Sequence, residues 1–76
     1  MSYKYCVEYY VKGVEKQVLG FNTLKECHAD MLFFIDEDKQ KLNKAGYKRR
    51  GSLKSGYIEY SHPILGVDSY VKVREQ

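Results

Sequence analysis

Residues 21 to 46 read FNTLKECHADMLFFIDEDKQKLNKAG and form the one stretch of the chain that is long and periodic enough for a helix. Thr23 and Glu26 make a capping box at its start, and Gly46 is well placed to end it. With a turn of about 100° per residue, apolar side chains gather on one face. They are Leu24, Cys27, Met31, Phe34, Ile35, Leu42 and Ala45. We therefore expect a helix that packs this face on the rest of the chain.

Some residues of this helix do not fit the apolar face. Phe33 points almost directly away from it, and Leu32 lies on its flank. Asp38 falls near the middle of the face, where an unpaired buried carboxylate costs several kcal/mol. We expect the helix to bend or break between Ile35 and Asp38, or to extend beyond the sheet. A functional buried carboxylate is the alternative.

Alternating residues predict a β-hairpin before the helix. From residue 3 to residue 11, apolar side chains at odd positions alternate with mostly polar ones at even positions. Lys12 and Gly13 then favour a two-residue turn. This turn places Val7 opposite Val18, with the buried residues of both strands on one side of the hairpin.

A second hairpin follows the helix, with strands at residues 57 to 62 and 68 to 74. Whether a further short strand forms at residues 47 to 53 stays open, because Gly51 and Ser52 weaken it. The chain is short enough to be one domain, residues 1 to 76. The predicted fold class is α+β. It has an antiparallel sheet of four to five strands, in the order β-β-α-β-β, with one helix packed on one face.

Charge is unevenly distributed along the chain. Residues 39 to 54 contain seven basic residues and no acidic one, whereas residues 1 to 38 carry a net charge of −3. Such a density favours contact with nucleic-acid phosphates or with an acidic protein surface. A solvated surface without a partner is the alternative. The candidate binding residues are Lys41, Lys44, Lys48, Arg49, Arg50 and Lys54.

An acidic segment precedes the basic one. Asp36 and Glu37 lie close to Leu32 and Phe33, and these four residues are a candidate protein interface. Glu37 and Lys41 are correctly ordered for an ion pair between successive helix turns. The alternatives are a solvated helix surface, an association of two copies through opposite charges, which would give a homodimer, and acids that mimic phosphates toward a nucleic-acid-binding target.

The sequence lacks the usual signatures of an enzyme. Cys6 and Cys27 are too few for a disulfide framework, and no Cys-x-x-Cys or His-x-x-x-His spacing suggests a metal. No glycine-rich phosphate loop occurs, and no nucleophile has a base and an orienting group nearby. The chain starts without a signal sequence, and its longest apolar run is far too short to span a membrane. We expect a soluble, cytoplasmic protein without cofactor, metal or catalytic residues.

One resemblance to a known family covers residues 5 to 29. The strand Tyr5-x-Val7-x-Tyr9, Lys16-Gln17 and the helix start Gly20-Phe21-Asn22-Thr23-Leu24-Lys25-Glu26 followed by Ala29 resemble the AP2-like arm-type DNA-binding domains of phage and transposon integrases. The resemblance implies a phage or mobile-element origin and, as in that family, a sheet that enters the DNA major groove. It supplies no contact residues.

These observations predict a small non-enzymatic binding protein. Its basic segment, residues 39 to 54, would engage the phosphate backbone of a nucleic acid. The alternative is an inhibitor or adaptor directed at a protein, which would bind its target through the acidic helix surface with Leu32 and Phe33.

Overall fold

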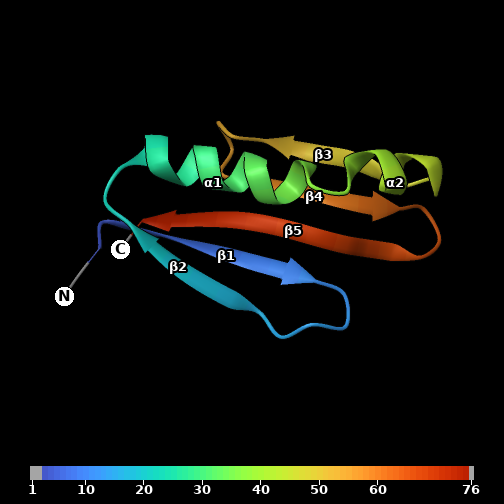
Figure 1. Cartoon of the computed structure of the whole chain (residues 1–76), viewed down its shortest axis with the longest axis horizontal. Helices are drawn as coiled ribbons and strands as arrows, with labels where there is room; N and C mark the ends of the chain where they lie inside the picture. The colour runs from blue at the N-terminus through green and yellow to red at the C-terminus, as the bar shows by residue number, and fades with distance from the viewer. Residues whose placement is uncertain (1–2, 76) are drawn as a thin grey trace.

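A computed structural model describes residues 3 to 75 and confirms the α+β class (Figure 1). Five strands form one antiparallel sheet, and two consecutive helices lie between the second and third strands. The fifth strand, which the sequence left open, is β3. The elements are β1 (Tyr5–Val11), β2 (Gln17–Phe21), α1 (Leu24–Asp36), α2 (Lys39–Lys44), β3 (Lys48–Ser52), β4 (Tyr57–His62) and β5 (Gly66–Glu75).

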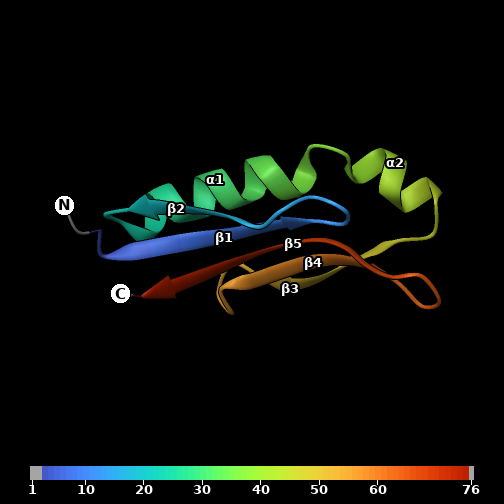
Figure 2. The ribbon, with the colours of Figure 1, turned by 90° about the horizontal axis from the view of Figure 1, so that it is seen from below.

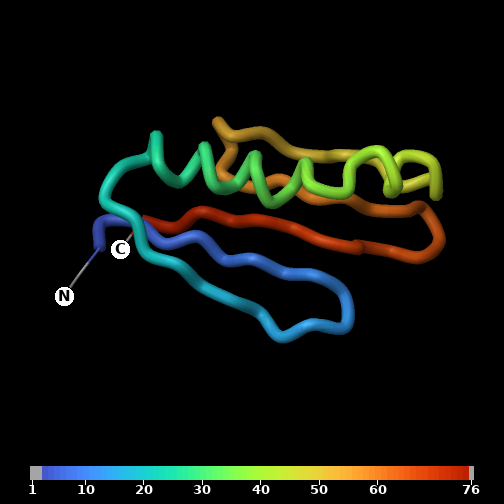
Figure 3. The backbone as a smooth tube through the Cα atoms, viewed as in Figure 1, coloured from blue at the N-terminus to red at the C-terminus, as the bar shows by residue number. Residues whose placement is uncertain are grey.

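The sheet has the strand order β2-β1-β5-β4-β3, so the pairing of β1 with β5 joins the two hairpins. This pairing runs along the whole of β1, from Tyr5 opposite Glu75 to Val11 opposite Ser69. The start of β1 and the end of β5 therefore lie at the same end of the molecule (Figure 3). β2 and β3 are the two edge strands.

Both helices lie on one face of the sheet (Figure 2). The core forms between this face and α1. In the sheet, residues paired across neighbouring strands share a face, so Val7, Val73 and Leu19 all point toward the helix. No helix or strand among residues 3 to 75 covers the opposite face, which we call the open face. The buried core residues are Val7, Tyr9, Cys27, Met31, Ile35, Ile58, Tyr60 and Val71.

The predicted helix start and break are both confirmed. At the start, the Glu26 backbone N–H donates to the Thr23 hydroxyl oxygen at 3.2 Å. α1 ends at Asp36, and Asp38 leaves the helical conformation with φ −113° and ψ 22°. As a result Asp38 is exposed rather than buried in the core. The centre of the predicted apolar face is buried, but Leu24 and Ala45 at its two ends are exposed.

The predicted register of the first hairpin is wrong by one residue. Val7 lies opposite Leu19 instead of Val18, and the turn between the strands is longer than two residues. In this turn the Val14 N–H donates to the Val11 carbonyl at 2.9 Å, and β2 begins only at Gln17. Because side chains alternate along a strand, the shift turns Leu19 toward the helix side and leaves Val18 on the open face, 52% exposed.

Gly51 and Gly13 provide a test of how tightly β3 is held. Both have positive φ, +94° and +83°. A Cβ atom on Gly51 would lie 2.0 Å from the Tyr57 carbonyl oxygen, whereas one on Gly13 would meet no atom of residues 3 to 75 within 4 Å. We predict that Gly13→Ala lowers the free energy of unfolding by roughly 1 kcal/mol, the cost of the backbone conformation alone. Gly51→Ala should cost roughly 3 kcal/mol or more, because it also separates β3 from β4.

Urea unfolding followed by circular dichroism at 25 °C measures both costs. Equal costs for the two variants would show that β3 can move to accept the added methyl group.

Candidate functional site

The fold divides the basic segment among several surfaces. Lys41 and Lys44 lie on α2, and Lys54 lies in the turn between β3 and β4. Lys48 and Arg50 are opposite Ser61 and Glu59 of β4, on the open face. The predicted binding residues therefore do not form a single patch.

Arg49 points to the other side of β3 and meets the acidic segment. It is opposite Tyr60, on the helix side of the sheet, and its guanidinium lies 3.1 Å from the Asp36 carboxylate. The ion pair is partly exposed, so its effect on stability is small. The ion pair nevertheless joins Arg49, which the sequence predicts as a nucleic-acid contact, to Asp36, which it predicts as a protein contact.

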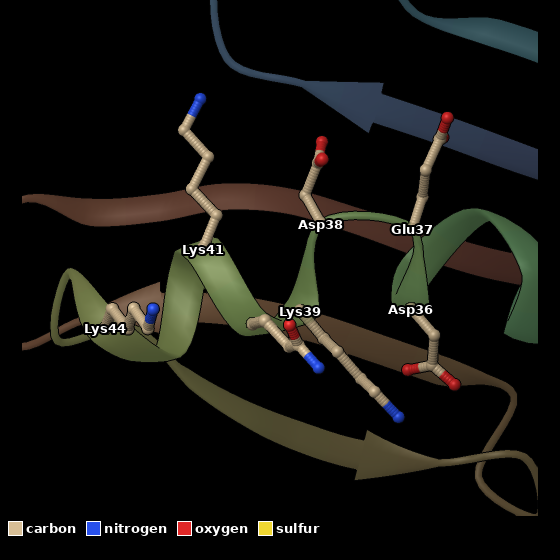
Figure 4. Close-up of a pocket in the computed structure, with 7 residues that line it drawn as sticks. Asp36, Glu37, Asp38, Lys39, Lys41 and Lys44 are labelled. Carbon is tan, nitrogen blue, oxygen red and sulfur yellow. The ribbon is translucent and has the colours of Figure 1, made fainter.

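A hollow of about 540 Å³ lies at the break between the two helices (Figure 4). Asp36 and Lys39 point toward β3, whereas Glu37, Asp38 and Lys41 point toward the β1 side. The expected ion pair between Glu37 and Lys41 does not form, because Glu37 lies in the break after α1 and Lys41 lies on α2. Acidic and basic side chains share this hollow, so it does not favour a ligand of one charge.

Tyrosines occupy the middle of the open face. Tyr70 of β5 stacks on Tyr10 of β1, with ring centroids 5.1 Å apart and planes 22° apart. The ring centroids of Tyr70 and Tyr57, which lies on β4, are 5.5 Å apart. The Lys16 ammonium lies 5.9 Å from the Tyr70 centroid. These contacts, with one another and with a cation, cover part of the ring faces.

The tyrosine hydroxyls bind the carboxylates of the open face. Tyr57 donates to Glu59 at 2.7 Å, and Tyr70 donates to Glu8. The hydrogen bond from Tyr70 lowers the pKa of Glu8, and nearby cations lower it further. Burial, followed by the bond to Glu59, raises the pKa of Tyr57 to about 12. Both acidic groups are thus held by neutral hydroxyl donors at neutral pH.

The cations of the open face lie around these tyrosines. Besides Lys48 and Arg50, the register places Lys72 and Arg74 of β5 on this face. Arg74 lies 3.8 Å from Glu8, whereas none of the other three forms an ion pair within residues 3 to 75. A hollow of about 230 Å³ opens beside β3, lined by Lys48, Arg50, Ser61, His62 and Pro63.

Phe33 is 77% exposed on the outer side of α1, as its position in the helix predicts. Leu32 is partly buried. Phe33 does not lie alone, because Leu19 of β2 is 50% exposed and lines the same hollow of about 160 Å³. The carboxylates of Asp30 and Glu37 also line it.

Within the described part of the chain, no three His, Cys, Asp or Glu side chains form a group that could hold a metal ion. Neither α1 nor α2 is long and apolar enough to cross a membrane.

Comparison of the chain with protein-family models, with curated proteins and with solved structures finds no match. The resemblance to arm-type DNA-binding domains therefore stays a prediction that rests on residues 5 to 29.

Sequence reasoning missed several members of the open face. Tyr10, Tyr57, Tyr70, Lys72 and Arg74 were assigned to strands but not to a shared surface. The signal was present in β4 and β5, where they alternate with the buried residues Ile58 and Val71. Alternation cannot show that β1 lies beside β5. This pairing places Tyr10 opposite Tyr70.

The bond between Tyr70 and Glu8 predicts a specific acid sensitivity. Because the native pKa of Glu8 is lowered, this group stabilises the fold above its ordinary pKa of 4.5. The contribution is lost as the pH falls below that value and through the lowered native pKa. We predict that the melting temperature of Glu8→Gln falls less than that of the unchanged protein between pH 6 and pH 3, because the amide oxygen still accepts from Tyr70.

Glu15→Gln is the matched control, since Glu15 lies in the β1–β2 turn and forms no ion pair within residues 3 to 75. Melting curves that shift equally with pH for both variants would contradict the assigned role of Glu8.

Proposed function

We propose that this protein binds nucleic acid through the open face of its sheet and contacts mainly the phosphate backbone. The supporting observation is that four basic side chains share this face, on β3 and β5, and that three of them form no ion pair within 4 Å among residues 3 to 75, although Arg50 lies opposite Glu59 and Lys72 opposite Glu8. They are Lys48, Arg50, Lys72 and Arg74.

The spacing of these cations favours a polyanion over a single small anion. Lys48 and Arg50 are two residues apart on one strand, about 7 Å. Lys72 is level with Ser52, so it lies two strands across from β3 and two residues beyond Arg50, about 12 Å away, and Arg74 lies two residues farther along. The separation of Lys48 and Arg50 is within about one Debye length at physiological salt, so their potentials add, whereas the cations of β5 are farther away and offer separate contacts. A chain of phosphates can contact several of these cations at once, and each contact releases counterions.

The tyrosines support contact with phosphates rather than with bases. Base stacking needs an accessible ring face. Here the faces of Tyr10 and Tyr70 contact each other, and Lys16 lies over Tyr70. These contacts cover part of the ring faces, so less of them is open to stacking on bases, while the cations around them can contact phosphates. Binding of this kind carries little sequence preference.

The test compares two variants that lose the same charge. Lys48→Ala with Arg50→Ala removes two cations from the open face, and Lys41→Ala with Lys44→Ala removes two from α2. We predict that the first pair weakens binding to all nucleic-acid sequences. It should also reduce the slope of log K against log salt by roughly 0.7 to 0.9 per lost contact. The second pair should leave both quantities nearly unchanged.

Fluorescence anisotropy with labelled duplex DNA, single-stranded DNA and single-stranded RNA, each in two sequences and between 20 and 200 mM salt, measures both quantities. No binding to any of the probes at 20 mM salt would exclude the proposed function. Equal losses for the two pairs of substitutions would attribute binding to net charge and exclude the open face as its site.

A further inference from the structure

The two edges of the sheet differ in how they are protected against pairing with another strand. β3 carries three consecutive basic residues, 48 to 50, and charged side chains discourage the addition of a strand. β2 (QVLGF) has no charged residue and no proline. One edge of its backbone is unpaired by residues 3 to 75, because β2 is the last strand in the sheet.

The helix side of β2 forms a ledge. α1 packs over the middle of the sheet and leaves β2 largely uncovered (Figure 1). Gln17 and Leu19 of β2 form the floor of this ledge, and Asp30, Phe33 and Glu37 of the helical segment form its wall. Leu19 and Phe33, both at least half exposed, line the same hollow there. The wall residues lie at intervals of three and four, on one side of the helix.

The charges of the ledge are all of one sign. Asp30 and Glu37 lie on either side of Phe33 along the chain, and no basic side chain among residues 3 to 75 lines the hollow. Asp30 accepts a hydrogen bond from Tyr9 with one carboxylate oxygen, Oδ2. That bond fixes the carboxylate in place and leaves Oδ1 as an acceptor for a partner.

We propose that the ledge binds an extended basic segment of another protein, which adds a strand to the free edge of β2. The backbone of the segment would pair with β2, one apolar side chain would lie between Leu19 and Phe33, and basic side chains would meet Asp30 and Glu37. A second copy of this chain is a poorer occupant, because pairing β2 with β2 would bring the acidic walls of two ledges together.

The spacing of the wall defines the pattern of the segment. At about 1.5 Å per residue, Asp30 is about 4.5 Å from Phe33 along the helix axis, and Phe33 is about 6 Å from Glu37. Side chains on one face of a strand are about 6.7 Å apart. The matching pattern is basic-x-apolar-x-basic, in which the three named side chains face the ledge and the two others face away.

The test uses two synthetic peptides and the full chain. The probe is acetyl-Gly-Lys-Thr-Leu-Thr-Lys-Gly-amide, and the control replaces both of its lysines with glutamate. In titrations followed by NMR, the lysine peptide should shift the backbone amides of residues 17 to 21 and 30 to 37 and slow hydrogen exchange in β2. The glutamate peptide should bind at least about tenfold more weakly.

Variants of the protein separate the ledge from other acidic surfaces. Phe33→Ser should weaken the lysine peptide about tenfold, the loss expected of an anchor residue. Ile64→Ser is the matched control, because Ile64 is 87% exposed in the turn between β4 and β5, outside the ledge. Glu37→Lys should shift the preference toward the glutamate peptide. Lys48→Ala with Arg50→Ala should leave peptide binding unchanged, which separates this proposal from the function of the open face.

Three results would overturn the proposal. The first is equal binding of the two peptides, and the second is amide shifts at the hollow between Asp36 and Lys44 in place of the ledge. The third is a concentration-dependent dimer, measured by light scattering and abolished by Phe33→Ser. That dimer would assign the ledge to a second copy.

Discussion

The surfaces of this protein depend on one geometric constraint, which is that a single narrow helical layer must cover a wide sheet. Five strands about 4.8 Å apart span roughly 19 Å between the outer strands. A helix with its side chains is about 10 to 12 Å wide. Because α1 packs over the middle of one face, β2 extends beyond it on one side, and the whole opposite face has no cover within residues 3 to 75. Both proposed binding surfaces are consequences of this mismatch.

An uncovered sheet face of this size must be stable in water without exposing an apolar patch, and tyrosine meets both needs. The rings of Tyr10, Tyr57 and Tyr70 pack against one another, and such pairs contribute about 0.5 to 1.5 kcal/mol beyond the burial of their area. Their hydroxyls bind Glu8 and Glu59, so the acidic groups of the face are satisfied within it. Most of the basic groups of the face form no ion pair within residues 3 to 75. A hydroxyl donor does not cancel the charge of a carboxylate, so the positive character of the open face comes from its four basic side chains on β3 and β5, which outnumber these two carboxylates.

Much of the fold could be predicted from the sequence, because it depends on local patterns. Thr23 and Glu26 mark the start of α1, and the conflict at Asp38 predicts the break. Phe33 could be placed outside the core by helical periodicity alone. The open face could not be predicted in this way. It requires the pairing of β1 with β5, whose residues are about 60 positions apart, and the face on which each residue of β3 lies. In the first hairpin, an error of one residue in the predicted register placed Val18 instead of Leu19 on the helix side of the sheet. The ledge, which contains Leu19, could therefore not be predicted.

The fold also changes the meaning of the charge pattern. In sequence, the acidic residues before position 39 and the basic residues after it adjoin each other and suggest one dipolar patch. In the structure they meet at a single ion pair, Arg49 with Asp36, because alternation along β3 sends its neighbours Lys48 and Arg50 through to the other side of the sheet. The cations of the open face and the carboxylates of the ledge are thus separated by the sheet itself. A polyanion on one side and a basic segment on the other would not compete for the same residues. Their opposite charges would also favour simultaneous binding, since each ligand adds to the field that attracts the other.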